Sequence, residues 1–301
     1  MEFLQPGSLA EAVETAQRYP GAVPIAGGTD VMVEMNFGRH RPPALLDLTQ
    51  VPELTGWGTA GGRLRIGAGV SYATLISELG ALLPGLAMAS RTVGSPQIRN
   101  RGTLGGNLGS ASPAGDTLPV LLASGAVVET ASMQGSRRIP AEEFCTGVKR
   151  NALRPGELIA AVLLPPAPGP QQFCKVGTRN AMVIAVASFA VELDPERRRV
   201  GTGIGSAAPT PRRAPAAEEF LAGVLAERGL WDRPGESAHA ELDTAIVDRF
   251  GELAAAAAAP IDDVRGTAAY RTHALAVMAR RALRWAWHDY IRGDGRAPAC
   301  A

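Results

Sequence analysis

Two segments with paired glycines constrain the fold of this chain more than any other feature of its sequence. We expect both loops to follow extended segments: the first loop comprises residues 26–30 and the second loop comprises residues 103–107. Glycine lacks a Cβ and adopts positive φ readily, so successive backbone N–H groups can converge on an anion. Both loops also carry hydroxyl or amide side chains. They predict a phosphate site whose contacts come mainly from backbone amides, against the alternative of two ordinary tight turns.

Neither loop matches the two commonest nucleotide-binding turns. A Rossmann turn needs G-x-G-x-x-G after the first strand, and the glycines at 201–205 have the wrong spacing for it. A P-loop needs a lysine that follows its glycines, and the chain has only two lysines, Lys149 and Lys175. A dinucleotide held here would therefore need a different fold.

Composition and charge narrow the class of protein. A length of 301 residues predicts two or three domains, and 46% hydrophobic with 20% charged residues is typical of a globular chain. The net charge of +1 argues against a nucleic-acid partner. Three scattered cysteines predict no metal site, because a cluster or structural zinc takes four ligands. The start lacks signal-peptide features and no apolar run reaches ~18 residues, so we expect a cytoplasmic protein without a membrane span.

The expected secondary structure mixes helices and strands. Ser8 and Glu11 form a capping box, and proline-rich residues 165–170 are the best domain boundary. The expected helices are a segment after Ser8, 71–79, 214–222, 242–258 and 270–291, with 31–35 as a helix or strand. The expected extended segments are 22–25, 42–48, a hairpin within 56–70, a helix-to-strand segment at 118–128, and 173–191 joined by a turn to 200–207.

Two long motifs resemble one known family. Residues 25–35 and 98–116 closely resemble the FAD-binding medium subunit of molybdenum hydroxylases, the xanthine and carbon monoxide dehydrogenase family. Similarity continues through 157–165 and 175–179 and ends in a C-terminal part at 203–213 and 260–271. It covers nearly the whole chain.

The resemblance implies an α+β fold. Its FAD-binding part would be the two-subdomain PCMH (vanillyl-alcohol oxidase-like) type, with subdomains at 1–55 and 56–170. A C-terminal α+β domain of the carbon monoxide dehydrogenase flavoprotein type, with a three-stranded sheet and helices, would occupy 171–301.

The resemblance also implies the cofactor contacts. The two loops would wrap the FAD pyrophosphate, Asp116 and Lys175 would touch FAD, and Ile184 would pack beside the isoalloxazine. Asp116 has the alternative of capping a helix near Thr117, and Lys175 that of a solvated lysine at a strand start. For Val93 and Ile159, which match apolar positions along the flavin, core packing is the alternative. The residues expected to bind FAD are Pro24, Ile25, Ala26, Gly27, Gly28, Thr29, Asp30, Val31, Val93, Thr103, Leu104, Gly105, Gly106, Asn107, Asp116, Ile159 and Lys175. No catalytic or metal-binding residue is expected, and the histidines and cysteines are given no role.

The implied function is electron transfer. Electrons from a molybdopterin cofactor in a large subunit would pass through iron-sulfur clusters of a small subunit to FAD, and then to NAD, oxygen or another acceptor. The implied assembly is a dimer of heterotrimers, of the xanthine dehydrogenase type. Two alternatives stay open: a non-catalytic FAD-dependent assembly module, and a single-chain flavin reductase of the same fold.

Overall fold

A parallel three-stranded sheet, in the order β1-β3-β2, begins the computed structural model, which describes residues 1–39, 41–180, 182–232 and 241–293. Its elements are β1 (Glu2–Leu4), α1 (Leu9–Arg18), β2 (Ala22–Ile25), α2 (Val31–Asn36) and β3 (Ala44–Asp47). The predicted capping box is confirmed, because Ser8 Oγ accepts a hydrogen bond from the Glu11 N–H at 3.2 Å. The segment after the first loop is a helix, and the strand at 22–25 is confirmed.

A five-stranded antiparallel sheet, in the order β4-β5-β10-β6-β7, follows. All seven residues of the central strand β10 are buried, and its register shifts between Ile159 and Ala161. The predicted hairpin within 56–70 and the helix-to-strand segment at 118–128 are confirmed. The elements of this part are η1 (Pro52–Leu54), β4 (Trp57–Ala60), β5 (Arg63–Gly67), α3 (Tyr72–Ser77), α4 (Pro84–Arg91), α5 (Pro96–Arg101), α6 (Leu104–Ser110), α7 (Leu118–Ala123), β6 (Val127–Ser132), β7 (Gly135–Pro140), α8 (Ala141–Phe144), β8 (Cys145–Gly147), β9 (Arg150–Asn151) and β10 (Leu158–Leu164).

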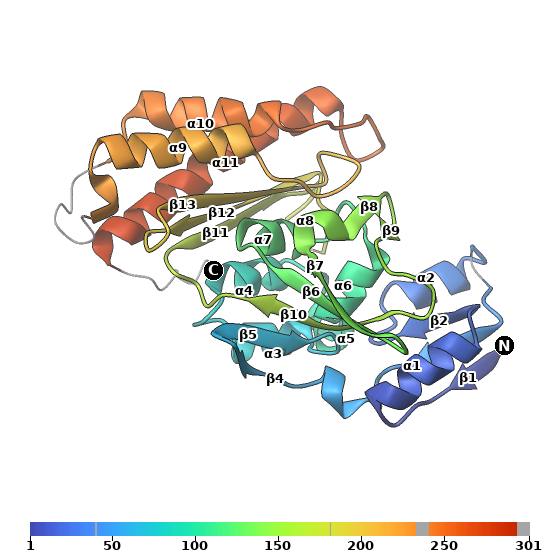
Figure 1. The fold of residues 1–301 in the computed structure, drawn as a ribbon. Coiled ribbons are helices and arrows are strands. Elements are labelled where there is room, and N and C mark those ends of the chain that lie inside the picture. The colour runs from blue at the N-terminus through green and yellow to red at the C-terminus, as the bar shows by residue number, and fades with distance from the viewer. Residues whose placement is uncertain (40, 181, 233–240, 294–301) are drawn as a thin grey trace.

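The C-terminal part is an antiparallel sheet, β11-β12-β13, with helices on one face (Figure 1). Its elements are β11 (Gln171–Val176), β12 (Ala187–Asp194), β13 (Arg199–Gly205), α9 (Pro215–Glu227), η2 (Leu230–Asp232), α10 (Thr244–Ala256) and α11 (Ala268–Arg292). The predicted three-stranded sheet, its helices and the α+β class are confirmed. The expected extended run at 173–191 is two strands separated by a loop.

The glycines at alternate positions of residues 201–205 lie on strand β13, where they allow another element to pack closely. A Cβ on Gly201 would lie 2.0 Å from the Ala123 carbonyl oxygen, and one on Gly203 would lie 1.9 Å from that of Pro119. Successive side chains of a strand point to opposite faces, so these glycines give one face of β13 a flat surface. Helix α7 therefore packs directly against the C-terminal sheet.

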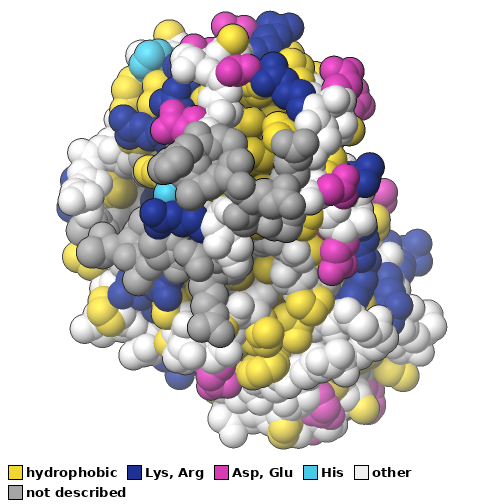
Figure 2. Space-filling view, turned by 90° about the vertical axis from the view of Figure 1, so that its left-hand side faces the viewer, with side chains coloured by type: hydrophobic (Ala, Val, Ile, Leu, Met, Phe, Trp, Pro, Cys, Tyr) yellow, Lys and Arg dark blue, Asp and Glu magenta, His cyan; other side chains and the backbone are white. Residues whose placement is uncertain are grey.

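The described part of the chain has two hydrophobic cores. One runs from Ala12 to Leu164 under the first two sheets and takes in Phe173 and Ala190, and the other runs from Ala187 to Ile291 between the third sheet and its helices. Acidic and basic side chains are intermixed on the face shown in Figure 2. His273 and His288 are exposed on α11, whereas His40, His239 and Cys300 lie outside the described residues.

Candidate functional site

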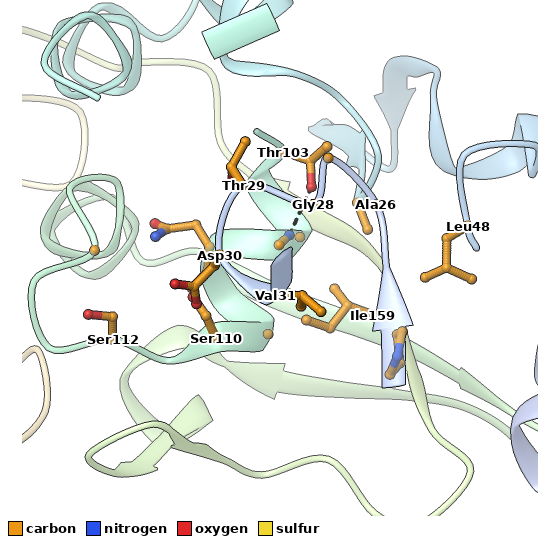
Figure 3. A pocket seen from close by; sticks show the side chains of 18 of the residues that line it. Ala26, Gly28, Thr29, Asp30, Val31, Leu48, Thr103, Ser110, Ser112 and Ile159 are labelled. Atoms are coloured by element: carbon orange, nitrogen blue, oxygen red, sulfur yellow. Dashed lines mark hydrogen bonds between the residues drawn. The ribbon is translucent and has the colours of Figure 1, made fainter. Parts of the chain in front are cut away.

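A cleft of about 610 Å³ lies where the first two sheets meet, and both glycine loops line it. In Figure 3 the first loop curves beside Thr103, with Asp30, Ser110 and Ser112 to the left of Val31 and with Ile159 and Leu48 to its right. Small-molecule and cofactor sites typically measure ~300–1,000 Å³ and combine apolar walls with a few polar groups. The cleft therefore has the size and the mixed lining of a cofactor site.

The backbone of the first loop requires both of its glycines. Gly28 has a φ of +73°, which L residues rarely adopt. A Cβ on Gly27 would lie 1.8 Å from the carbonyl oxygen of Arg101, the last residue of α5. Gly27 is therefore the point at which the first loop touches the chain that leads into the second.

The backbone N–H groups of residues 26–31 are unpaired within the described part of the chain, where none donates to a protein acceptor. All six residues line the cleft. The carbonyl oxygen of Gly28 is occupied, since it accepts from the Met32 N–H at 3.1 Å. Consecutive free amides at a concave surface form a binding site for an anion such as a phosphate.

The second loop has a different structure. It follows helix α5, not a strand, and Thr103 caps helix α6. The amides of Leu104 and Gly105 donate to the carbonyl oxygens of Val70 and Ala68 at 3.0 and 2.8 Å, and that of Gly106 donates to Thr103 Oγ1 at 2.9 Å. The expectation of free amides in this loop is wrong, because the protein itself uses them.

The glycines of the second loop instead allow close approach. A Cβ on Gly105 would lie 2.5 Å from the Cβ of Ala68, so this glycine lets α6 pack on the chain after β5. A Cβ on Gly106 would meet only Thr103 Oγ1, at 3.0 Å. Gly106 therefore leaves space open on the cleft side of α6.

Asp116 and Lys175 form a buried ion pair at the cleft. Lys175 Nζ donates to Asp116 Oδ2 at 2.6 Å and to the Thr92 carbonyl oxygen at 3.1 Å, and both charged side chains are 8% exposed. Burial raises the pKa of Asp116, and Lys175 opposes that rise. Asp116 Oδ1 is buried with no hydrogen-bond partner in the described chain. A buried polar atom without a partner is costly, so Oδ1 is suited to accept a hydrogen bond from a ligand.

The alternatives for these two residues are both wrong. Thr117, not Asp116, is the N-cap of α7, and Lys175 lies near the end of β11 and is buried.

Fourteen of the predicted site residues line the cleft, and Ile25, Leu104 and Lys175 do not. Leu104 belongs to the hydrophobic core, and Lys175 lies behind Asp116. Ile184, expected beside the isoalloxazine, also lines the cleft and is 59% exposed.

Several residues that line the cleft were not predicted from the sequence. Tyr72 is buried, and burial together with the charges of Asp116 and Asp30 raises the pKa of its phenol, so it stays neutral at physiological pH. An isolated bridge between Ser71 and Thr103 brings Tyr72 beside the second loop, and no local pattern signals such a long-range pairing. The other missed residues include Glu34, Leu48, Leu54, Ser110, Ser112, Lys149, Asn151 and Glu157.

Lys149 crosses from the turn between β8 and β9 to helix α2. It has a φ of +53°, its N–H donates to the Ala111 carbonyl oxygen at 3.1 Å, and its ammonium pairs with Glu34. The pair is half-exposed, and surface pairs of this kind add ~0–1 kcal/mol of stability. It closes one edge of the cleft without adding much to stability.

The described residues lack the features of a metal site and of a membrane-spanning helix. They contain no group of three or more His, Cys, Asp or Glu side chains placed to hold a metal ion. Nor do they contain a helix long and apolar enough to cross a membrane.

Two family models match the chain. The FAD binding domain in molybdopterin dehydrogenase matches residues 1–167, and the CO dehydrogenase flavoprotein C-terminal domain matches residues 237–286.

Similar proteins span nearly the same length. The carbon monoxide dehydrogenase medium chain of Afipia carboxidovorans is 31% identical over 94% of this chain and 95% of its own. The nicotine 6-hydroxylase medium subunit of Paenarthrobacter nicotinovorans is 29% identical over 94% and 96%. Among solved structures, reconstituted CO dehydrogenase from Oligotropha carboxidovorans superposes with a TM-score of 0.85 at 30% identity, over 95% of this chain and 97% of that one.

Proposed function

The chain belongs to the FAD-binding medium subunits of molybdenum hydroxylases, and we propose from this membership that it carries electrons between a partner's iron-sulfur clusters and a soluble acceptor. It is an oxidoreductase flavoprotein subunit whose cofactor is FAD. Substrate oxidation takes place on a partner subunit.

The free amides of residues 26–31 are the observation that carries this proposal. Residues 26–31 line a cleft in which Asp116 Oδ1 also has no partner within the described chain, so the protein offers donors at one place and a buried acceptor at another. FAD offers the complement of both, an anionic pyrophosphate and a flavin with ring N–H and ribityl hydroxyl donors. The residues present therefore fit the cofactor.

Each part of the site has a proposed task. The first loop binds the pyrophosphate through its amides, and Gly106 lets the cofactor approach helix α6 closely. The residues around Val93, Ile159 and Ile184 form the apolar wall of the flavin site. When bound, FAD accepts two electrons and returns them singly or as a hydride.

Asp116 and Lys175 act as a unit in this proposal. Asp116 Oδ1 accepts a hydrogen bond from the flavin, while Lys175 donates to Oδ2, which favours the ionised carboxylate and holds it in place. Ionisation matters because a protonated carboxyl would lose the pair with Lys175 and become a weaker acceptor. Lys175 is thus a positioning residue in this site, not a contact of the flavin.

The finer assignment is a xanthine dehydrogenase-type complex in the cytoplasm. It would be a dimer of heterotrimers with a small iron-sulfur and a large molybdopterin subunit, and NAD would be its acceptor. A putative xanthine dehydrogenase FAD-binding subunit of Escherichia coli, 28% identical over 92% of both chains, supports this type. Relatives named for carbon monoxide and nicotine match at 31% and 29% identity, so the test must include all three substrates.

Cofactor binding by the purified chain tests the proposal. We expect one FAD to bind per chain, and FMN to bind far more weakly because it lacks the pyrophosphate. The chain alone should oxidise no purine, carbon monoxide or nicotine, whereas the assembled complex should reduce NAD with its own substrate. A chain that binds no FAD, or that oxidises a substrate unaided, would overturn the proposed function.

A further inference from the structure

Ser206, in the C-terminal part of the chain, connects two segments that form walls of the cleft. It follows β13, has a φ of +59° and is 8% exposed. Its N–H donates to the Pro113 carbonyl oxygen at 2.8 Å, and its Oγ donates to that of Ala185 at 2.6 Å. Its own carbonyl oxygen accepts from Arg271 Nη1 at 2.5 Å. One residue thus uses its amide, hydroxyl and carbonyl to bind three segments.

Arg271 of helix α11 completes this connection from inside the C-terminal core. The side chain is 2% exposed, and Nη1 also donates to the Val186 carbonyl oxygen at 2.7 Å. Nη2 pairs with Asp263 Oδ1 at 2.5 Å, so the buried charge is compensated. Only a planar fork with several donors can serve these acceptors together, and lysine cannot replace it.

The segments held in this way line the cleft. Pro113 lies between Ser112 and Ala114, which both line it, and Ala185 follows Ile184, which lines it as well. The backbone around Pro113 and Ala185 is irregular, so no helix or strand ladder fixes its position. Hydrogen bonds from Ser206 and Arg271 take over that task.

We infer that Ser206 and Arg271 are positioning residues of the flavin site, through which the C-terminal part fixes the distance between the Pro113 and Ile184 walls. This inference rests on the proposed function, since the walls matter only if the cleft holds FAD. It extends that function by assigning a cofactor role to residues that do not touch the cofactor. It also gives the C-terminal part a task in FAD binding besides its own folding.

Two substitutions at Ser206 separate positioning from folding. Ser206→Ala and Ser206→Gly both remove the hydroxyl that holds Ala185, but glycine also relieves the left-handed backbone. Arg271→Lys keeps the charge and loses the fork. Thr202→Val is the matched control, because it removes a buried hydroxyl on β13 that donates to Glu218 and accepts from the Ala214 N–H, away from the cleft.

The readouts are FAD affinity, FAD release rate and the visible absorption bands of the bound flavin, each beside the thermal midpoint of the FAD-free chain. Ser206→Ala and Ser206→Gly should each weaken FAD binding about fivefold, the loss of one hydrogen bond, with faster release and shifted flavin bands. Arg271→Lys should weaken FAD binding more strongly than either Ser206 variant. Thr202→Val should lower the thermal midpoint and leave FAD binding unchanged. Wild-type affinity and spectra in both Ser206 variants would overturn the inference, whereas a wild-type chain that binds no FAD would instead overturn the proposed function.

Discussion

The two glycine loops look alike in the sequence but act by different physical means. In the first loop and at Val31 after it, the amides of residues 26–31 have no acceptor among the described residues, whereas the second loop donates its amides to Ala68, Val70 and Thr103. In the first, glycine permits a left-handed turn and a close backbone contact. In the second, it removes side chains that would fill the cleft or push α6 from its neighbour. A glycine pair can therefore signal either free donors or free space.

Substitution of Gly27 in the first loop should weaken FAD binding more than any substitution in the second loop. In Gly27→Ala the new Cβ would lie 1.8 Å from the Arg101 carbonyl oxygen, so the loop backbone has to move. Each displaced amide loses a hydrogen bond to phosphate worth ~1.5–3 kcal/mol, so FAD affinity should fall at least ~100-fold. A titration of flavin fluorescence measures it.

Gly58→Ala is the control for Gly27→Ala, because a Cβ at Gly58 meets nothing within 4 Å. It should bind FAD normally. Near-normal affinity in Gly27→Ala would mean that the first loop does not hold the pyrophosphate.

The sequence predicted the elements better than the roles of the loops. Local patterns were sufficient for the strand at 22–25, the capping box at Ser8 and the C-terminal helices, because each depends on neighbouring residues. The occupied amides of Gly105 and Gly106 depend on Ala68 and Thr103. No local pattern predicts that the Gly105 amide is occupied, because its acceptor, Ala68, lies far away in the sequence. The free amides of the first loop therefore could not be distinguished from the occupied amides of the second on sequence alone.

The second loop should respond to Gly106→Ala with weaker binding and little loss of stability. The new methyl group would enter the cleft and crowd the cofactor at a cost of ~1–3 kcal/mol, a loss of about tenfold or more in FAD affinity. The FAD-free chain should unfold within ~1 kcal/mol of wild type, since the methyl group meets only Thr103 Oγ1. Chemical denaturation and FAD titration measure the two effects, and a large loss of stability without loss of affinity would reverse the assignment.

Thr103→Val, in the same loop, should lower folding stability more and FAD affinity less than Gly106→Ala does. It removes the hydroxyl that accepts from the Gly106 N–H and caps α6, at a cost of ~1 kcal/mol of stability. FAD affinity should fall less than in Gly106→Ala, because the capped amide never served the phosphate. Chemical denaturation measures the loss of stability. Ser71→Ala, which removes the N-cap of α3, is the control, because that cap lies outside the glycine loops.

Substitution of Glu157, which lines the cleft just before β10, should have the smallest effect, a change in how folding stability depends on pH. Hydrogen bonds from Arg137 hold its pKa below the usual value. A carboxylate with a lowered pKa stabilises the fold above its unfolded pKa of ~4.3, and that contribution disappears as pH falls through the lower folded value. Glu157→Gln should therefore flatten the part of the stability-pH curve that lies below the unfolded pKa of ~4.3. An unchanged curve would exclude this pair as a source of acid sensitivity.

Hydrogen exchange of the two loops, with and without FAD, tests the central claim most directly. Without FAD, amides of residues 26–31 should exchange quickly and those of 104–106 slowly, because only the latter have protein partners. Addition of FAD should slow exchange at 26–31 and leave 104–106 nearly unchanged. Slow exchange at 26–31 in the FAD-free chain, or protection by FAD confined to the second loop, would contradict the account.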